Sequence, residues 1–378
     1  MRSTGYFQCS DILDESNFPV NETLSEVVKG LAQAHKAYLH QLEDPRRPSS
    51  QIQILFVVQP NERNVFDQRF LEYELLHRHN IRVVRRTLGE LETHARLEDG
   101  RTRTLLLPLL PPAAATMSLD GLVEISVVYF RAGYTPTDYP TPREFETRKM
   151  LERSRAIKCP SIALQLAGSK KIQAMLSQPG VLEHFVLSDR WRPPSLPVSP
   201  SQVKGNDPND VFLSGEETVG VVGRLRASWM EMWGLEEDGG VERARREALG
   251  LVLKPQREGG GNNVYRSHIL PFLDRLPEEE REAWIAMALI RVPKGVKNWL
   301  VRSGVESVRS NVVSELGVFG WALFGYEQSG EDNTNGRKKM RLEEGSGGYL
   351  LRTKGENSDE GGVAAGFSVL DSVVLVGE

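Results

Sequence analysis

The chain has 378 residues, of which 39% are hydrophobic and 26% are charged, an ordinary composition for a globular protein of two or three domains. The net charge of −4 excludes the global basic field of nucleic-acid-binding proteins, and no apolar run is long enough to span a bilayer. The amino-terminal stretch lacks the apolar core of a secretory signal, and the two cysteines form no CxxC pair. We therefore expect a cytoplasmic enzyme or binding protein whose partners include neither nucleic acid nor membrane.

The pattern over residues 22–130 predicts alternating helices and strands. Apolar spacing indicates helices over 22–42, 62–79 and, more weakly, 88–95, and short apolar runs indicate strands over 51–58, 81–84 and 123–130. The prolines of 105–117 favour a loop insertion there. Strand, helix, strand, helix, strand is typical of a parallel α/β layer. In the helix of 62–79 the residues expected to face inward are Phe66, Phe70, Leu71, Leu75 and Leu76.

Polar side chains follow two of these strands. They are Glu62, Asn64 and Gln68 after the first strand, and Arg131 and Tyr134 after the third. Because ligands of open parallel sheets bind beyond the carboxyl ends of the strands, both clusters should lie on one rim of the sheet. An arginine, a tyrosine and amides suit a small zwitterion with a carboxylate. Helix capping by an asparagine and a surface salt bridge for Arg131 explain the same residues equally well. The absence of a GxGxxG pattern disfavours a dinucleotide-binding oxidoreductase.

The middle of the chain carries candidate phosphate-binding lysines. A charged helix is predicted over 143–157, and Lys170 and Lys171 open a short helix, where backbone donors and ammonium groups suit an anion. Solvated surface lysines are the alternative. Residues 190–217 are predicted to be a long loop, 224–249 a helix, and 276–290 a charged helix that turns into an apolar helix or strand.

A glycine-rich loop follows the apolar strand of residues 251–253. The loop holds Lys254, Arg257, Glu258 and three glycines at 259–261. Bare backbone N–H groups approach a phosphate closely, the two cations neutralise it, and Glu258 suits a Mg²⁺ that bridges phosphate oxygens. A flexible surface loop is the alternative. No Gly-Lys-Ser/Thr follows, so the loop is not a Walker A motif.

The last hundred residues contain further candidate ligands. The apolar strand of 312–324 contains Glu315, whose buried carboxylate needs either a ligand or a salt-bridge partner. Residues 328–348 are polar and glycine-rich, which predicts a mobile loop. Arg352 and Lys354 fall on one face of a strand, and 361–366 forms either a nest of backbone donors or a plain Gly/Ala turn.

Taken together, these segments resemble the eukaryotic glutathione synthetase family. The matching segments, in the order of the family, are ERNVFDQ at 62–68, VVYFRAGY at 127–134, KCPSIALQLAGSKKIQ at 158–173, LKPQREGGGNNVY at 253–265, SELGVFG at 314–320, and LLRTKGE with GGVAAG within 350–366. The resemblance implies an α/β (α+β) ATP-grasp fold with an inserted Rossmann-like parallel α/β substrate domain. It implies a helical remnant at 1–49, the substrate-binding domain at 50–160 and an ATP-binding domain with a glycine-rich lid at 161–378.

The reaction that the resemblance implies is ligation of γ-glutamylcysteine to glycine by a cytoplasmic homodimer. ATP phosphorylates the cysteinyl carboxylate, the glycine amine attacks the acyl phosphate, and glutathione, ADP and phosphate leave. Such chemistry depends on positioning and charge neutralisation rather than on covalent help from the protein. ATP and Mg²⁺ are the expected cofactors.

The resemblance also assigns residues to sites. Substrate binding falls to Glu62, Arg63, Asn64, Gln68, Arg131, Ala132, Gly133, Tyr134, Arg352, Val363 and Ala364, with Arg352 as the catalytic residue. ATP binding falls to Lys170, Lys254, Pro255, Gln256, Arg257, Glu258, Gly259, Gly260, Gly261, Asn262, Asn263, Tyr265, Met287, Ala288, Leu289, Ile290, Glu315, Lys354 and Glu360, with Glu258 as the metal ligand.

The sequence departs from the family in three respects. Ala288 and Leu289 stand where polar residues are usual, and Glu360 stands where Asp is usual. A family motif with two metal ligands, together with a substrate arginine, is not found before residue 22. Since loss of one group that stabilises a transition state costs about 10²–10³ in rate, we expect this chain to be inactive or weak as a ligase. The alternative function is nucleotide or dipeptide binding without turnover.

Overall fold

The computed structural model describes residues 15–42, 48, 51–62, 64–98, 100, 102–109, 121–187, 215–257, 261–302, 304–326, 340–359, 361, 363 and 366–375. The chain forms two compact units, one of Met1–Ser161 with Pro293–Glu378 and one of Ile162–Val292. The first unit therefore joins the two flanking parts of the sequence. The domains expected from the resemblance, 1–49, 50–160 and 161–378, group the chain differently, because they assign residues 293–378 to the ATP-binding domain, and that division stays a prediction.

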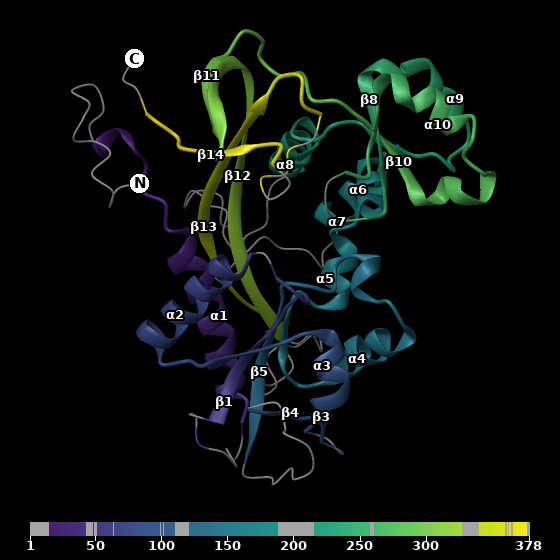
Figure 1. Ribbon diagram of the computed structural model, residues 1–378. Coiled ribbons are helices and arrows are strands. Elements are labelled where there is room, and N and C mark those ends of the chain that lie inside the picture. Colours follow the sequence, from purple (N-terminus) through teal and green to yellow (C-terminus); the bar gives the residue numbers. More distant parts are fainter. Residues whose placement is uncertain are drawn as a thin grey trace. The chain divides into compact units, whose positions relative to one another are not determined.

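A six-stranded sheet forms the base of the first unit (Figure 1). Its strand order is β2-β1-β5-β4-β3, and β6 pairs with the second half of β5. Pairings among β2, β1 and β5 are parallel, as predicted, and β6, which was not predicted as a strand, also pairs in parallel with β5, whereas β4 and β3 are antiparallel. The strands are β1 (Ile52–Val57), β2 (Val83–Arg86), β3 (Arg96–Leu97), β4 (Leu105–Pro108), β5 (Leu122–Phe130) and β6 (Ile157–Cys159).

Helices cover both faces of this sheet, with α1 and α2 on one side and α3 and α4 on the other (Figure 1). Successive residues of β1 therefore face opposite cores: Phe56 packs with α1 and α2, and Leu55 packs with α3 and α4. Burial on both faces explains why five of the six residues of this strand are apolar, with Gln53 as the exception. The helices are α1 (Thr23–His40), α2 (Val65–His79), α3 (Leu88–His94) and α4 (Pro142–Arg153).

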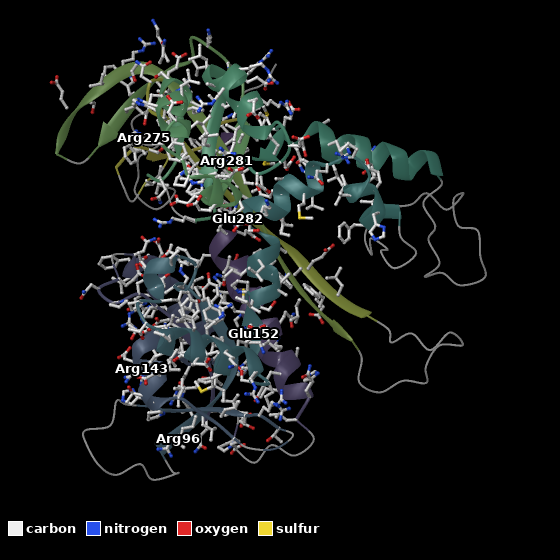
Figure 2. The ribbon with its side chains drawn as sticks, turned by 90° about the vertical axis from the view of Figure 1, so that its right-hand side faces the viewer. Arg96, Arg143, Glu152, Arg275, Arg281 and Glu282 are labelled. Carbon is white, nitrogen blue, oxygen red and sulfur yellow. The ribbon has the colours of Figure 1, made fainter. Side chains whose placement is uncertain are left out.

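Capping residues fix where α3 and α4 begin. Thr87 and Glu90 form a capping box at α3, and Thr141 and Glu144 form one at α4, where Pro142 occupies the first helical position. Figure 2 shows the two ends of α4, labelled at Arg143 and Glu152. The cap of α4 sets the residue at which the loop between β5 and α4 ends.

A second sheet of the first unit is antiparallel, with order β11-β12-β13-β14. Its central hairpin pairs β12 with β13 from Val312–Gly355 to Tyr326–Met340, and α1 packs against it. The indole N–H of Trp321 on β12 donates to Glu26 of α1 at 3.1 Å. The strands are β11 (Lys297–Arg302), β12 (Val305–Tyr326), β13 (Met340–Gly355) and β14 (Val369–Asp371).

The second unit has its own four-stranded sheet, of order β7-β10-β8-β9, and its own core. Leu251 and Leu253 of β8 pack there with Trp233 and with Ile269 of α10. The elements are α5 (Ile162–Ala167), α6 (Lys170–Ser177), α7 (Val181–Leu187), α8 (Gly215–Ala227), β7 (Met232–Gly234), α9 (Gly240–Glu247), β8 (Leu251–Pro255), β9 (Val264–Tyr265), α10 (Ile269–Leu273) and β10 (Trp284–Ala288).

Five sequence-based expectations about elements were wrong. Residues 105–108 form the buried strand β4 rather than a loop, and β7 interrupts the helix expected over 224–249. Residues 278–283 form a 3-10 helix rather than a charged α-helix, before β10. The loop expected over 328–348 is strand β13 from residue 340 onward. In α2, Phe66, Phe70 and Leu76 are exposed rather than buried.

Candidate functional site

The carboxyl ends of β1 and β5 lie side by side, as the strand order predicted. Val57 and Phe130, the last residues of the two strands, are paired in register. The N–H of Arg131 donates to the Val57 carbonyl at 2.8 Å, so the pairing extends one residue past β5. The two clusters that follow these strands therefore leave the sheet from the same rim.

Glu62 organises the first cluster. Its Oε1 accepts the backbone N–H of Asn64 at 2.8 Å, and its Oε2 accepts Nε2 of Gln68 at 2.7 Å. Gln68 is 1% exposed, and its Oε1 is buried without a hydrogen-bond partner. A buried carbonyl without a partner has lost its hydrogen bonds to water and gained none from the protein. This oxygen is therefore suited to accept an N–H from a ligand. Arg63 lies outside the described residues.

The alternative that Asn64 caps α2 with its side chain does not hold. Asn64 occupies the position before α2, but its side chain makes no capping hydrogen bond. Among the described residues Arg131 forms no ion pair, and its nearest polar contact is a 3.5 Å hydrogen bond from Nη1 to the Tyr129 hydroxyl. Its Nε is buried and lacks a partner. A guanidinium with an unused, buried donor is suited to bind a carboxylate.

The residues after Arg131 form a tight loop. Ala132 is buried in the core of α3 and α4, Gly133 has φ +88°, which favours glycine, and the Tyr134 side chain is exposed. Asp138 accepts hydrogen bonds from the backbone of this loop. The loop therefore presents Arg131 and Tyr134 from a fixed backbone.

Arg352 and Glu315 face each other across the β12–β13 hairpin. They are register partners and form an ion pair. The expectation that Glu315 is buried was wrong, because this carboxylate is 61% exposed, while the salt-bridge alternative was correct. Lys354 lies two residues along β13 and donates to the Asp359 carbonyl at 2.9 Å. Val363 is half-buried, and Ala364 and Glu360 lie outside the described residues.

In the second unit, strand β8 carries the start of the glycine-rich loop. Lys254 pairs with Ile285 of β10, so its side chain is on the same face of the sheet as that of Met287. Pro255 is buried, Gln256 and Arg257 follow, and Gly261 has φ +88°. Glu258, Gly259 and Gly260 lie outside the described residues. Strand β10 ends at Ala288, which pairs with Leu251 at the start of β8, and Leu289 and Ile290 follow it.

Gln256 joins this loop to helix α6. Its Oε1 accepts the backbone N–H of Lys171 at 3.1 Å, while its Nε2 is buried without a partner. Lys171 forms an ion pair with Glu236, and Lys170 contacts Gln173 at 3.3 Å. The predicted lysines therefore lie beside the start of the loop. An unused amide donor there fits an acceptor oxygen of a nucleotide.

Strand β9 follows the glycine-rich loop in the sequence. Asn262 is exposed, and Asn263 donates to the Tyr265 hydroxyl at 3.0 Å. Val264 and Tyr265 pair with β8. The structure thus brings Lys254, Gln256 and the two lysines of α6 together in this unit, while Glu315 and Lys354, also assigned to ATP, belong to the first unit.

The described residues do not form a recognisable metal centre. No group of three or more His, Cys, Asp or Glu side chains among them is arranged to hold a metal ion. Glu258, the expected ligand, lies outside the described residues. The Mg²⁺ expectation therefore stays a prediction, and no chemical step is derived through the ion.

Sequence reasoning missed three residues in and around the loop that follows β5. They are Gln59 after β1, Asp138 in the loop, and Arg148 on α4. The Arg148 guanidinium is buried 3.6 Å from the centre of the Phe130 ring, and its Nε and Nη1 lack partners. One sequence signal could have revealed Asp138, because Thr135 and Asp138 have the spacing of a capping box.

Comparisons with known proteins identify the family to which the chain is similar. A family model described as eukaryotic glutathione synthase matches residues 52–167, and one described as eukaryotic glutathione synthase, ATP binding domain, matches 205–375. The chain is 36% identical over 366 residues to the chloroplastic glutathione synthetase of Arabidopsis thaliana, covering 96% of this chain and 56% of that protein. It is 35% identical to glutathione synthetase of Dictyostelium discoideum, covering 96% and 64%, and 37% identical to that of Homo sapiens, covering 84% and 56%.

One solved structure shares the fold. A glutathione synthetase-like effector from Globodera pallida superposes with a TM-score of 0.58 at 18% identity, covering 96% of this chain and 64% of that one. The comparisons define an α/β protein of the glutathione synthetase-like class, with a segment that matches an ATP-binding domain. The chain belongs to the eukaryotic glutathione synthase family. It spans 56% to 64% of the length of the relatives named above.

Proposed function

We propose that this chain acts in the ATP-dependent joining of γ-glutamylcysteine to glycine. The observation that carries the proposal is the pair of unused buried groups on one rim of the sheet, the Gln68 Oε1 acceptor and the Arg131 Nε donor. A γ-glutamyl group carries an ammonium and a carboxylate, the two groups that such an acceptor and donor would bind. Family membership supports the same substrate class.

Each predicted group has a physical task in this reaction. In the first unit, Arg352 would neutralise the charge that the cysteinyl carboxylate already carries, and in the second unit Lys254 and Lys170 would neutralise the phosphates of the nucleotide. ATP supplies the phosphoryl group that is transferred. The bound dipeptide would then be positioned for attack by the glycine amine, which converts an encounter between molecules into a reaction within one complex.

Assembly and location remain proposals. The homodimer and the cytoplasmic location expected from the resemblance stay predictions. No helix among the described residues combines the length and the apolar character needed to cross a bilayer.

The test is ADP release from Mg-ATP in the presence of γ-glutamylcysteine and glycine, with each substrate omitted in turn. Release that requires all three substrates supports the ligase. No release, with ATP and dipeptide still bound in calorimetric titrations, would replace the ligase with a binding function. No binding of either ligand would overturn the proposal altogether.

A further inference from the structure

The loop between β5 and α4 is built around one carboxylate, that of Asp138. Its Oδ2 accepts the backbone N–H of Gly133 at 3.0 Å, of Tyr134 at 3.2 Å and of Thr135 at 3.1 Å. The same oxygen accepts the Thr135 hydroxyl at 3.0 Å. Successive backbone N–H groups thus form a nest whose anion is supplied by the chain itself.

The other oxygen of Asp138 reaches the neighbouring strand. Its Oδ1 accepts Nε2 of Gln59 at 3.4 Å, and Gln59 lies two residues beyond the end of β1. One carboxylate therefore connects the segments that follow β1 and β5. These two segments carry Glu62 with Gln68, and Arg131 with Tyr134.

Tyr139, the residue after Asp138, also stabilises the loop. Its hydroxyl donates to the Gly133 carbonyl at 2.8 Å, and its ring stacks on Phe145 of α4 at 4.6 Å between centroids. Burial raises the pKa of Tyr139, so the hydroxyl keeps the proton that it donates. Asp138 and Tyr139 together bind the N–H and the carbonyl of Gly133, which holds the peptide groups on both sides of this residue and with them its positive φ.

Removal of the carboxylate would leave three parallel N–H dipoles without an acceptor. Hydrogen bonds to an ionised acceptor are roughly twice as strong as neutral ones, so no neutral group substitutes fully. The loop would then exchange among conformations whose N–H groups face water, and Arg131 would lose its fixed position.

We propose that Asp138 is a positioning residue for the γ-glutamyl dipeptide, which it orients by holding the Arg131–Tyr134 backbone against the end of β1. Asp138 acts through the loop and does not itself touch the substrate. This inference rests on the proposed function, because the ligand it serves is the dipeptide.

The experiment compares wild type with Asp138→Ala and Asp138→Asn by calorimetric titration with γ-glutamylcysteine and, separately, with ATP. We expect Asp138→Ala to raise the dipeptide Kd by about 10- to 100-fold, the scale of a misplaced binding group, with the ATP Kd unchanged. Asp138→Asn keeps one acceptor oxygen without the charge, so its loss should be smaller. Should Asp138→Ala fold poorly, the Asn variant still carries the comparison.

Glu144→Ala is the matched control. Glu144 also accepts a backbone N–H and a threonine hydroxyl, both from Thr141. These hydrogen bonds cap α4 and do not involve the backbone of Arg131–Tyr134. Both alanine variants should lower the melting temperature, and only Asp138→Ala should lose dipeptide affinity. Equal dipeptide affinity of wild type and Asp138→Ala would overturn the inference and leave the proposed function intact. Failure of the wild type itself to bind dipeptide would instead overturn the proposed function, and the inference with it.

Discussion

Gln68 shows what a single side chain contributes to the candidate site. Its Nε2 is fixed by Glu62, and its buried Oε1 has no protein partner. Gln68→Ala removes this acceptor, and a lost buried hydrogen bond costs about 1–3 kcal/mol, so the Kd for γ-glutamylcysteine should rise by roughly 10- to 100-fold. Titration calorimetry measures the change.

The control for this variant is Gln41→Ala. Gln41 is exposed at the end of α1, so its replacement should leave dipeptide affinity at the wild-type value. If Gln68→Ala and Gln41→Ala bind the dipeptide equally well, the acceptor on Gln68 has no role in binding.

His35 predicts a pH dependence of stability. Its Nδ1 lies 2.7 Å from the Ser126 hydroxyl, which donates to the Gln53 carbonyl, and burial lowers the pKa of His35 to about 4. Because the folded protein favours the neutral imidazole, this contribution is fully present above the unfolded pKa near 6.5 and is lost as pH falls toward 4. The loss should be on the order of 3 kcal/mol.

His35→Gln, which does not titrate, tests this prediction. Urea denaturation of both proteins near neutral pH and at about pH 4.5 gives the free energies of unfolding. The wild type should lose more stability on acidification than the variant. Parallel losses in the two proteins would show that His35 is not the group responsible.

Several residues of the site could be predicted from sequence, and others could not. Glu62, Gln68 and Arg131 were predicted because they follow buried strands whose ends must share one rim. Asp138 and Gln59 were missed, since they act on backbone groups that only the folded loop brings together. Glu315 was expected to be buried because its neighbours are apolar, yet those neighbours lie on an exposed hairpin.

At the scale of elements, the contact between α1 and β12 gives a sharp test. A Cβ at Gly30 of α1 would lie 2.9 Å from Cγ of Trp321. Alanine in place of glycine ordinarily stabilises a helix by about 0.5–1 kcal/mol, but overpacking costs about 1–3 kcal/mol. Gly30→Ala should therefore lower the free energy of unfolding, as measured by urea denaturation.

Gly89 provides the comparison within the same unit. It lies in α3, and a Cβ there would meet no atom within 4 Å. Gly89→Ala should be neutral or stabilising. A Gly30→Ala variant as stable as Gly89→Ala would mean that the helix and the hairpin do not pack as closely as described.

The elements that sequence patterns failed to predict share a physical cause. Strand β4 contains a proline at its end and lies beside β5, so local propensity favoured a loop while tertiary pairing produced a strand. In α2 the buried residues include Gln68 and Glu72, and Glu72 pairs with Arg85 of β2 at 2.8 Å. Because Gln68 and Glu72 lie on the buried face of α2, Phe66 and Phe70 are exposed.

At the scale of the whole molecule, the two units differ in whether one continuous segment of the sequence forms them. Residues 162–292 are continuous and have their own core, whereas the first unit needs two separate segments. A fragment of residues 162–292 should therefore fold alone, with a helical far-ultraviolet spectrum and a cooperative urea transition. A fragment of residues 1–161 should not, since α1 would lack β12 and β13.

The two fragments serve as controls for each other under identical conditions. A cooperative transition for 1–161 would show that α1 does not depend on the hairpin. A structureless 162–292 fragment would show that the second unit is not independent.

The contacts of α1 and of the segment just before it can be completed only late in synthesis. Asn17 accepts the N–H of Leu375, Asn21 donates to the Tyr349 carbonyl, and Glu26 accepts from Trp321, so partners lie 295 to 358 residues apart. At about 5–20 residues per second, a ribosome that has finished α1 needs roughly 15 to 60 s more to make them. Throughout that interval the part of α1 at Glu26 and Gly30 lacks its hairpin partner, which makes the nascent chain a client for chaperones.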